Sequence, residues 1–235
     1  MTGMLASVTS VAEAHTVLNA GVDIIDLKDP QAGALGALPL KRVSEIVEII
    51  GMERPLSATI GDLPLVPLQI HDAAAEMAET GVDIVKVGLF TGPGQRGCVA
   101  ALAPLCASGK RIVIVLFADQ QPDLTLLPRI AASGCSGVML DTADKHGGGL
   151  TACLTQDKLR SFVRQAKELG LLTGLAGSLR AEDIPQLLPL GSDYLGFRGA
   201  LCTGVRTSAL SFAAVRQIRT LIPQSVNIIE QRMLA

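Results

Sequence analysis

The chain has 235 residues, of which 49% are hydrophobic and 18% are charged, and its 20 basic and 22 acidic residues give a formal net charge of −2. This apolar content excludes a disordered chain, and the absence of a basic surplus disfavours a nucleic-acid-binding function. The longest stretch without a charged residue, residues 97–109, contains Pro104 and is shorter than the roughly 18 residues that a membrane span needs.

The cysteines, the histidines and the first residues of the chain carry no signal for a metal site or for export. The five cysteines never form a CxxC pair and the three histidines are scattered, so no zinc site is predicted and the thiols are expected to be reduced and buried. The first residues lack the basic and apolar regions of a signal peptide. We therefore expect a cytoplasmic protein without a metal and without a nucleic-acid or membrane partner.

A short phrase recurs along the chain, in which a glycine stands shortly before an apolar, strand-like run. It begins at Gly21 and Gly81, and weaker copies begin at Gly134 and Gly191, so that the intervals are 60, 53 and 57 residues. Each interval is about twice the length of one strand-plus-helix unit of roughly 30 residues. One further strand is therefore expected in each gap.

Short apolar runs fill these gaps, and one more precedes the first copy. In chain order the predicted strands are 4–8, 24–26, 56–60, 84–88, 111–116, 137–141, 171–176 and 194–195. Runs without strict alternation are typical of a parallel sheet that is buried on both faces. Helical patterns lie between them, for example at 11–19, 70–79 and 157–169.

Eight strand-plus-helix units in a chain of this length predict a single (β/α)8 TIM barrel domain over residues 1–235. The alternative is an open doubly wound sheet, but no G-x-G-x-x-G follows the first strand. Function in a (β/α)8 barrel gathers at the carboxyl ends of the strands, so candidate site residues are sought there.

Two lysines stand at matching points of repeated strands. Asp26 and Lys28 are two residues apart and so share one face of the second predicted strand, and Lys86 interrupts the apolar run of the fourth. Burying such charges is costly, which favours a functional role over a rim salt bridge. If both lysines reach the same mouth, repulsion and burial favour a neutral amine, which is the nucleophile that a Schiff base requires.

Further acids and a third lysine follow other strands. Asp141 ends the sixth predicted strand and Lys145 follows it in the loop, which completes an acid–base set able to move protons between neighbours. Asp62 and Asp119 come just after the third and fifth strands. These two are weaker candidates for substrate contact because acids are common in solvated loops.

Small residues after the last two strands predict a phosphate site. Gly177 and Ser178 follow the seventh strand, and Arg198, Gly199 and Ala200 follow the eighth. Small residues let backbone N–H groups approach an anion, and these two loops commonly hold phosphate in barrels. Arg198 could add a charge-assisted contact.

The combination of motifs resembles a known enzyme family. It comprises Asp-x-Lys-x-Pro at 26–30, Ser-Ala-Thr-Ile-Gly-Asp at 57–62, Ile-Val-Lys-Val-Gly at 84–88, Met-Leu-Asp-Thr-Ala at 139–143, Leu-Ala-Gly-Ser at 175–178 and Arg-Gly-Ala at 198–200. These motifs are similar, in order, to those of the (5-formylfuran-3-yl)methyl phosphate synthases of methanofuran biosynthesis. The similarity runs from about residue 4 to residue 203.

The resemblance implies a barrel lyase that condenses two molecules of the phosphorylated triose glyceraldehyde 3-phosphate and needs no metal or organic cofactor. Lys28 falls on the family's Schiff-base lysine and Lys86 on its proton-accepting lysine, while Asp26, Asp141 and Lys145 match its other active-site residues. The apolar segment 221–229 could pack on the barrel or on a second copy of the chain, so a homo-oligomer stays open.

Two alternatives remain at the level of the sequence. Asp-x-Lys on a barrel strand also serves phosphate-binding decarboxylases and epimerases, in which the lysine protonates a carbanion without becoming covalently attached. A non-catalytic barrel that binds a phosphorylated metabolite is the other alternative. Neither predicts an adduct that borohydride can trap on Lys28.

Overall fold

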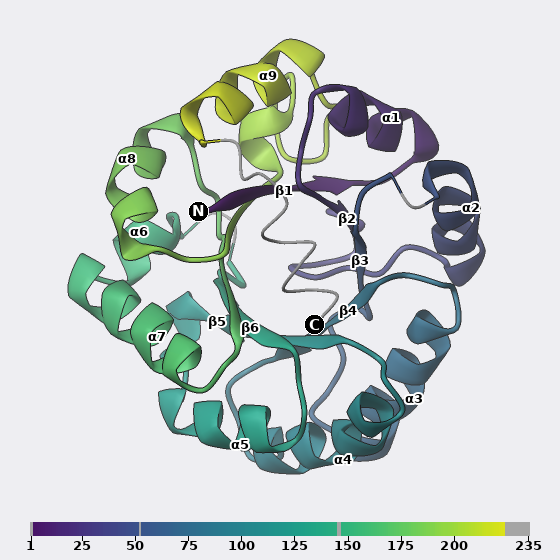
Figure 1. The fold of residues 1–235 in the computed structure, drawn as a ribbon, viewed down its shortest axis with the longest axis vertical. Coiled ribbons are helices and arrows are strands. Elements are labelled where there is room, and N and C mark those ends of the chain that lie inside the picture. Colours follow the sequence, from purple (N-terminus) through teal and green to yellow (C-terminus); the bar gives the residue numbers. More distant parts are fainter. Residues whose placement is uncertain (1, 52, 145–146, 224–235) are drawn as a thin grey trace.

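The structure is a computed structural model that describes residues 2–51, 53–144 and 147–223. Eight parallel strands close into a barrel in sequence order, and the helices surround it (Figure 1). The strands are β1 (Gly3–Val8), β2 (Ile24–Leu27), β3 (Leu56–Thr59), β4 (Ile84–Leu89), β5 (Ile112–Phe117), β6 (Gly137–Asp141), β7 (Leu172–Leu175) and β8 (Tyr194–Phe197). The predicted (β/α)8 TIM barrel is confirmed, and each predicted strand is present with its ends shifted by a few residues at most.

Helices connect the strands on the outside of the barrel. They are α1 (Val11–Asn19), α2 (Leu40–Ile50), α3 (Pro67–Ala78), α4 (Gln95–Ala107), α5 (Leu127–Ala132), α6 (Leu150–Cys153), α7 (Gln156–Glu168), α8 (Ile184–Leu187) and α9 (Phe212–Leu221). Short 3₁₀ turns lie at η1 (Ala118–Gln120), η2 (Leu124–Leu126), η3 (Ala181–Asp183), η4 (Leu188–Leu190) and η5 (Gly199–Leu201). Within the described ranges, none of these helices is both long and apolar enough to pass through a membrane.

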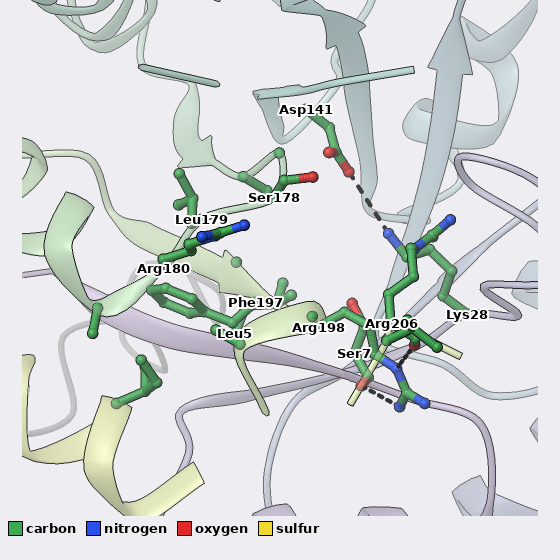
Figure 2. A pocket seen from close by; sticks show the side chains of 18 of the residues that line it. Leu5, Ser7, Lys28, Asp141, Ser178, Leu179, Arg180, Phe197, Arg198 and Arg206 are labelled. Atoms are coloured by element: carbon green, nitrogen blue, oxygen red, sulfur yellow. Dashed lines mark hydrogen bonds and ion pairs between the residues drawn. The ribbon is translucent and has the colours of Figure 1, made fainter. Parts of the chain in front are cut away.

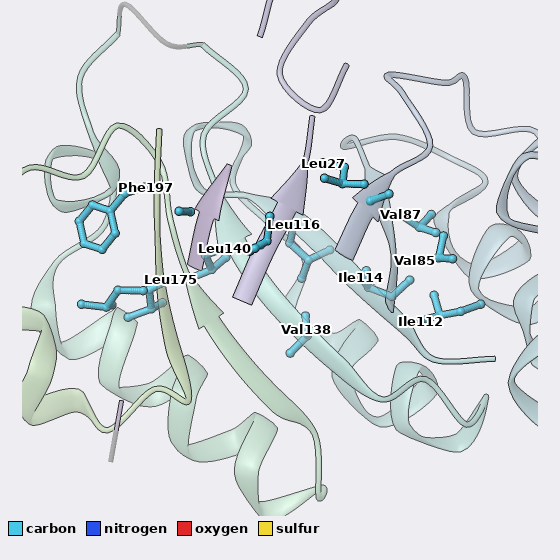
Figure 3. Packing of buried hydrophobic residues seen from close by; sticks show 14 of the residues in the cluster. Leu27, Val85, Val87, Ile112, Ile114, Leu116, Val138, Leu140, Leu175 and Phe197 are labelled. Atoms are coloured by element: carbon cyan, nitrogen blue, oxygen red, sulfur yellow. The ribbon is translucent and has the colours of Figure 1, made fainter. Parts of the chain in front are cut away.

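The apolar side chains divide between the two faces of the sheet. On β5, Ile112, Ile114 and Leu116 pack outward against the helices (Figure 3). Val113 and Val115 belong to a separate cluster inside the barrel. Successive side chains of a strand point to opposite faces, so the strands present apolar residues on both sides and read as continuous apolar runs. The large outer core fixes the positions of the strands and leaves the inner face free to carry polar groups near the mouth.

The recurrent glycine phrase has a structural role at the amino-terminal end of the barrel. Its aspartates accept hydrogen bonds from backbone N–H groups of neighbouring strands: Asp23 from Met4 at 2.7 Å, and Asp83 from Leu56 at 2.7 Å. Asp193 likewise accepts from the backbone N–H of Thr173 on β7, at 2.8 Å. The preceding glycines have positive φ values, as a helix terminator requires. The repeated aspartates therefore join the adjacent strands of three pairs, β1 with β2, β3 with β4 and β7 with β8, at the end of the barrel away from the mouth.

Candidate active site

A cavity of about 620 Å³ opens at the carboxyl ends of the strands. Its lining includes Ser7 from β1, Lys28 directly after β2, Lys86 from β4 and Asp141 at the end of β6. The loops after β7 and β8 complete the wall (Figure 2). The two lysines thus open into one cavity, as the proposed use of both of them requires.

The side chain of Asp26 is not among the described residues that line this cavity, but it binds two that are, Ser7 and Lys86. It is fully buried on the inner face of β2 and accepts hydrogen bonds from Ser7 at 2.8 Å, from Ser57 at 2.7 Å and from Nζ of Lys86 at 2.9 Å. Ser7 and Ser57 are the register partners of Asp26 on the two flanking strands. Serines at the same level of the two flanking strands, β1 and β3, thus donate to the carboxylate from either side.

The charge of Asp26 is stabilised despite its burial. Desolvation by itself would raise the pKa of Asp26, but the positive charges of Lys86 and Lys28 and the hydrogen bonds from Ser57 and Lys86 outweigh it, so the pKa lies below its ordinary value. A carboxylate in this state holds an amine in place and balances its charge. It is poorly suited to donate a proton itself.

Lys28 has a different carboxylate for its partner. Its Nζ lies 3.6 Å from Oδ2 of Asp141, and both side chains are buried. The other oxygen of Asp141 accepts the backbone N–H of Thr142 at 2.7 Å. This pair is looser than the contact between Lys86 and Asp26. The described ion pairs therefore join Lys28 to β6 and Lys86 to β2, so each lysine faces a carboxylate from a different strand.

The loops after β7 and β8 present backbone groups to the cavity. Gly177, Ser178, Gly199 and Ala200 all line it. Gly177 has φ +114° and Ser178 has φ +49°, a left-handed turn that aims the Ser178 side chain into the cavity (Figure 2). Among the described residues, no acceptor engages the N–H groups of Ser178, Gly199 or Ala200. These amides suit an anion such as phosphate.

Arg198 does not fit its expected role as a phosphate contact. Its guanidinium forms an ion pair with both oxygens of Glu13 and also donates to the carbonyl oxygens of Ser7, Arg206 and Ser208. All five of its N–H donors are engaged within the protein. We correct the expectation accordingly: a buried arginine paired to α1 holds the loop after β8 in shape, and its side chain has no donor left for an anion.

Arg198 lines the cavity, whereas Asp62 and Asp119 are not among the described residues that do. Asp62 accepts the N–H groups of Ala34 and Leu35, at 2.7 and 2.8 Å. Asp119 accepts those of Ala143 and Asp144, at 2.9 and 2.7 Å. Each acid thus clamps the loop of a neighbouring strand, which is a positioning role rather than the substrate contact that we expected.

The remaining expectations concern segments that the structure describes only in part. Lys145 lies outside the described residues, as does the part of the apolar segment 221–229 that follows residue 223. Leu221, at the end of α9, is exposed. The acid–base role of Lys145 and the packing of that segment therefore stay predictions.

Sequence reasoning missed three residues at the site. The serines at 7 and 57 could have been found, because a small polar side chain inside a buried apolar run calls for a partner. Arg206 lines the cavity from the loop after η5. Nothing in its local pattern marks it, because a loop arginine is ordinarily solvated.

Comparison with known proteins gives matches over most of the chain. A family model described as 4-HFC-P synthase matches residues 4–219. The (5-formylfuran-3-yl)methyl phosphate synthase of Methanopyrus kandleri is 36% identical over 211 residues, covering 85% of this chain and 89% of the relative. That of Methanocaldococcus jannaschii is 35% identical over 212 residues, covering 86% and 90%. A Methylorubrum extorquens protein that bears the same name provisionally is 43% identical over 215 residues, covering 91% and 89%.

Solved structures share the architecture at low identity. A 3-hexulose-6-phosphate synthase superposes with a TM-score of 0.67 at 18% identity, covering 94% of this chain and all of the other. Phosphoribosyl anthranilate isomerase from Thermotoga maritima superposes with a TM-score of 0.68 at 10% identity, covering 94% and 98%. At these identities the likeness concerns the fold alone.

Proposed function

The chain belongs to the (5-formylfuran-3-yl)methyl phosphate synthase family of methanofuran biosynthesis, and on this premise we propose that it is a lyase that condenses two molecules of glyceraldehyde 3-phosphate. The product is 4-(hydroxymethyl)-2-furancarboxaldehyde phosphate. The two trioses lose one phosphate and two waters, and the other phosphate stays on the furan. The observation that carries the proposal is the convergence of Lys28 and Lys86, each beside its own carboxylate, on one cavity.

In this proposal Lys28 is the nucleophile. Its amine attacks the aldehyde carbon of one triose and, with loss of water, forms an iminium. Lys28 sits at the mouth end of β2 and lines the cavity, with the carboxylate of Asp141 3.6 Å away. An anion at this distance would stabilise the positive iminium once it forms.

Lys86 handles the proton in this proposal. An iminium acidifies the adjacent carbon, and a base within reach of that carbon must take its proton. Lys86 lines the same cavity and is held by Asp26. Hydrogen bonds from Ser7 and Ser57 fix the carboxylate of Asp26 in turn. Lys145 and Asp141 are proposed as further members of the acid–base set.

A retained phosphate fits the loops after β7 and β8. Backbone N–H groups of Ser178, Gly199 and Ala200 supply donors without a mobile side chain, and η5 begins at Gly199. Such donors hold an anion at little cost in side-chain entropy. We assign them to the phosphate that remains on the product.

The experiment that tests the proposal traps the iminium with borohydride in the presence of glyceraldehyde 3-phosphate and maps the modified peptide by mass. The adduct is expected on Lys28. Lys28→Arg should abolish both the adduct and the turnover while keeping a positive charge beside Asp141, and Lys28→Ala should do the same. Lys158→Ala, at an exposed site on α7, is the matched control and should react like the wild type.

Turnover is followed by release of inorganic phosphate together with the ultraviolet absorbance of a new furan aldehyde. Phosphate release without that absorbance would contradict ring formation. An adduct on another lysine, or none, would favour the non-covalent decarboxylase or epimerase alternative. Stabilisation of the fold by ribulose 5-phosphate but not by glyceraldehyde 3-phosphate would support that alternative directly.

A further inference from the structure

The proposed reaction brings two phosphate groups into one cavity, yet the loops after β7 and β8 supply backbone donors for one. Resting on the proposed function, we infer that Arg206 forms a second anion subsite, which binds the phosphate that is expelled. Its ligand is the phosphate monoester of the triose attached to Lys28, and after elimination it is inorganic phosphate.

The position of Arg206 is the first argument. Its side chain is half-buried and lines the cavity, and Figure 2 draws it on the same side of the view as Lys28, away from Ser178 and Arg180. Asp141, the ion-pair partner of Lys28, has the largest electrostatic effect on Arg206 among the charged groups around it. Arg206 is therefore placed at the nucleophile's end of the cavity, and Ser178 with its backbone amide lies at the other.

The donors of Arg206 are the second argument. Among the described residues, its guanidinium makes a single and long hydrogen bond, 3.5 Å from Nη2 to the carbonyl oxygen of Gly33. Burial lowers the pKa of Arg206, and Asp141 and Asp62 oppose this effect. The result is a partly desolvated cation with most of its donors directed to no protein acceptor. A bidentate contact to phosphate would satisfy them.

The other two described arginines that line the cavity do not combine a partly buried guanidinium with free donors. Arg198 has all five of its donors engaged within the protein. Arg180 is exposed, lies in the loop after β7 and faces Glu182 at 3.9 Å. The guanidinium of Arg206 alone among these three combines partial burial with free donors in the described part of the chain.

Arg206 is also held in place before any substrate arrives. Nε of Arg198 donates to the carbonyl oxygen of Arg206 at 3.0 Å, and Nη2 of Arg198 donates to that of Ser208 at 3.0 Å. Arg198 is itself locked by Glu13. The loop that carries Arg206 is therefore preorganised, which lowers the entropic cost of binding an anion there.

The chemistry at Lys28 places the leaving group near Arg206. In the iminium of glyceraldehyde 3-phosphate, C1 is bonded to Nζ, C2 carries the acidic hydrogen and C3 carries the phosphate ester. Loss of the C2 proton to a base moves the C–H electron pair into a C1=C2 bond and gives a neutral enamine. The nitrogen lone pair then restores C=N, the C1=C2 pair moves to C2=C3, and the C3–O bond breaks with its electrons leaving on the phosphate.

This elimination needs no oxidant or reductant, and negative charge grows on the departing oxygen. A cation fixed near that oxygen stabilises the transition state more than the ground state, which is the condition for catalysis. Arg206 therefore acts on the step that releases phosphate. It has no part in forming the iminium itself.

The test follows the mass of the adduct that borohydride captures on Lys28 during a single turnover with glyceraldehyde 3-phosphate. In the wild type, captured trioses with and without phosphate are both expected. In Arg206→Gln, the adduct should keep its phosphate and the single-turnover rate of phosphate release should fall about a hundredfold. Arg206→Lys should show a smaller loss, because it restores the charge without the bidentate geometry.

Controls separate this inference from the proposed function. Arg216→Gln, on the exposed side of α9, should leave adduct mass and rate unchanged, and thermal melting should show that both Arg206 variants are folded. Wild-type rates and adduct masses in Arg206→Gln would overturn the inference alone. An Arg206→Gln enzyme that forms no adduct would also overturn it, because Arg206 would then act before elimination. If the wild type forms no adduct on Lys28, the proposed function is contradicted, and this inference, which rests on it, fails as well.

Discussion

Nζ of Lys86 on β4 donates a 2.9 Å hydrogen bond to Oδ1 of Asp26 on β2, across the intervening strand β3. The contact is possible because both side chains lie on the inner face of the barrel and the lysine stem is long enough to pass β3. Both groups are almost completely buried. Neither charge can be removed alone without leaving the other buried and without this ionic partner.

We therefore predict strong coupling between these two residues. Asp26→Asn and Lys86→Met should each lower the free energy of unfolding by about 3–5 kcal/mol, because each leaves an unpaired buried charge. The double variant should be less destabilised than the sum of the two, since no charge is then stranded. Urea denaturation of the wild type, both single variants and the double variant measures this, and simple additivity would contradict the pairing.

A second prediction concerns Glu13, whose bond to Arg198 shapes the loop after β8. Glu13→Gln should lower the free energy of unfolding by about 1.5–3 kcal/mol at neutral pH, the usual worth of a hydrogen bond to a charged group. It should also slow turnover, because Arg198 would no longer be locked while it holds the backbone of Arg206. The exposed Glu76→Gln on α3 is the control and should change stability by less than about 0.5 kcal/mol.

The contribution of Glu13 should depend on pH in a defined direction. Burial acts to raise the pKa of Glu13, but the hydrogen bonds and charge from Arg198 and Thr9 outweigh it, so the folded pKa lies below the ordinary value of 4.5. The stabilisation is therefore complete above pH 4.5 and is lost as the pH falls through the folded pKa. The stability gap between wild type and Glu13→Gln should narrow on acidification in urea titrations. A gap that widens below pH 4.5 would refute this account.

Gly177 provides a third prediction. A Cβ at this position would stand 2.9 Å from Cγ2 of Thr142 and 3.0 Å from its backbone nitrogen, at a φ of +114°. Gly177→Ala should therefore combine about 1–2 kcal/mol of backbone strain with about 1–3 kcal/mol of overpacking. It should also raise the KM for glyceraldehyde 3-phosphate. Gly191 has φ +71° and open space around an added Cβ. Gly191→Ala should therefore introduce backbone strain without overpacking, and its KM should equal that of the wild type.

A fourth prediction separates loop positioning from substrate contact at Asp119. Asp119→Asn should weaken the clamp on Ala143 and Asp144, so hydrogen exchange at those two amides should accelerate and turnover should fall. The exposed Asp157→Asn should change neither. If activity falls in Asp119→Asn while exchange at both amides stays as in the wild type, Asp119 acts in some way other than as a loop clamp.

Much of the fold was predictable because its signals are local. Paired glycine phrases and short apolar runs mark the strands, and the helix predicted at 11–19 coincides with α1. Candidate residues directly after strands were also predictable in part, because parallel strands deliver their carboxyl ends to one mouth. This reasoning brought Lys28, Lys86 and Asp141 together, and the structure places all three on one cavity.

The same reasoning could not predict which of these side chains form ion pairs with each other. Asp26 and Lys28 are neighbours in the chain, yet the structure pairs Asp26 with Lys86 and Lys28 with Asp141. Arg198, Asp62 and Asp119 stand at positions typical of site residues, but each is engaged by backbone or by a carboxylate from a distant segment. A loop such as the one that carries Arg206 has no periodicity from which its direction can be read.

The order of apolar and small residues along the chain was enough to specify eight buried strands, their closure, and which end would carry chemistry. Those features follow from side-chain periodicity and glycine conformation, which act over a few residues. Only the tertiary structure decided which charges share a hydrogen bond, which acids hold loops, and that Arg206 faces Lys28's end of the cavity. These pairings depend on distances across the barrel, because the free energy of a buried charge changes when its partner moves by a few ångströms. The spacing of residues along the sequence does not determine those distances.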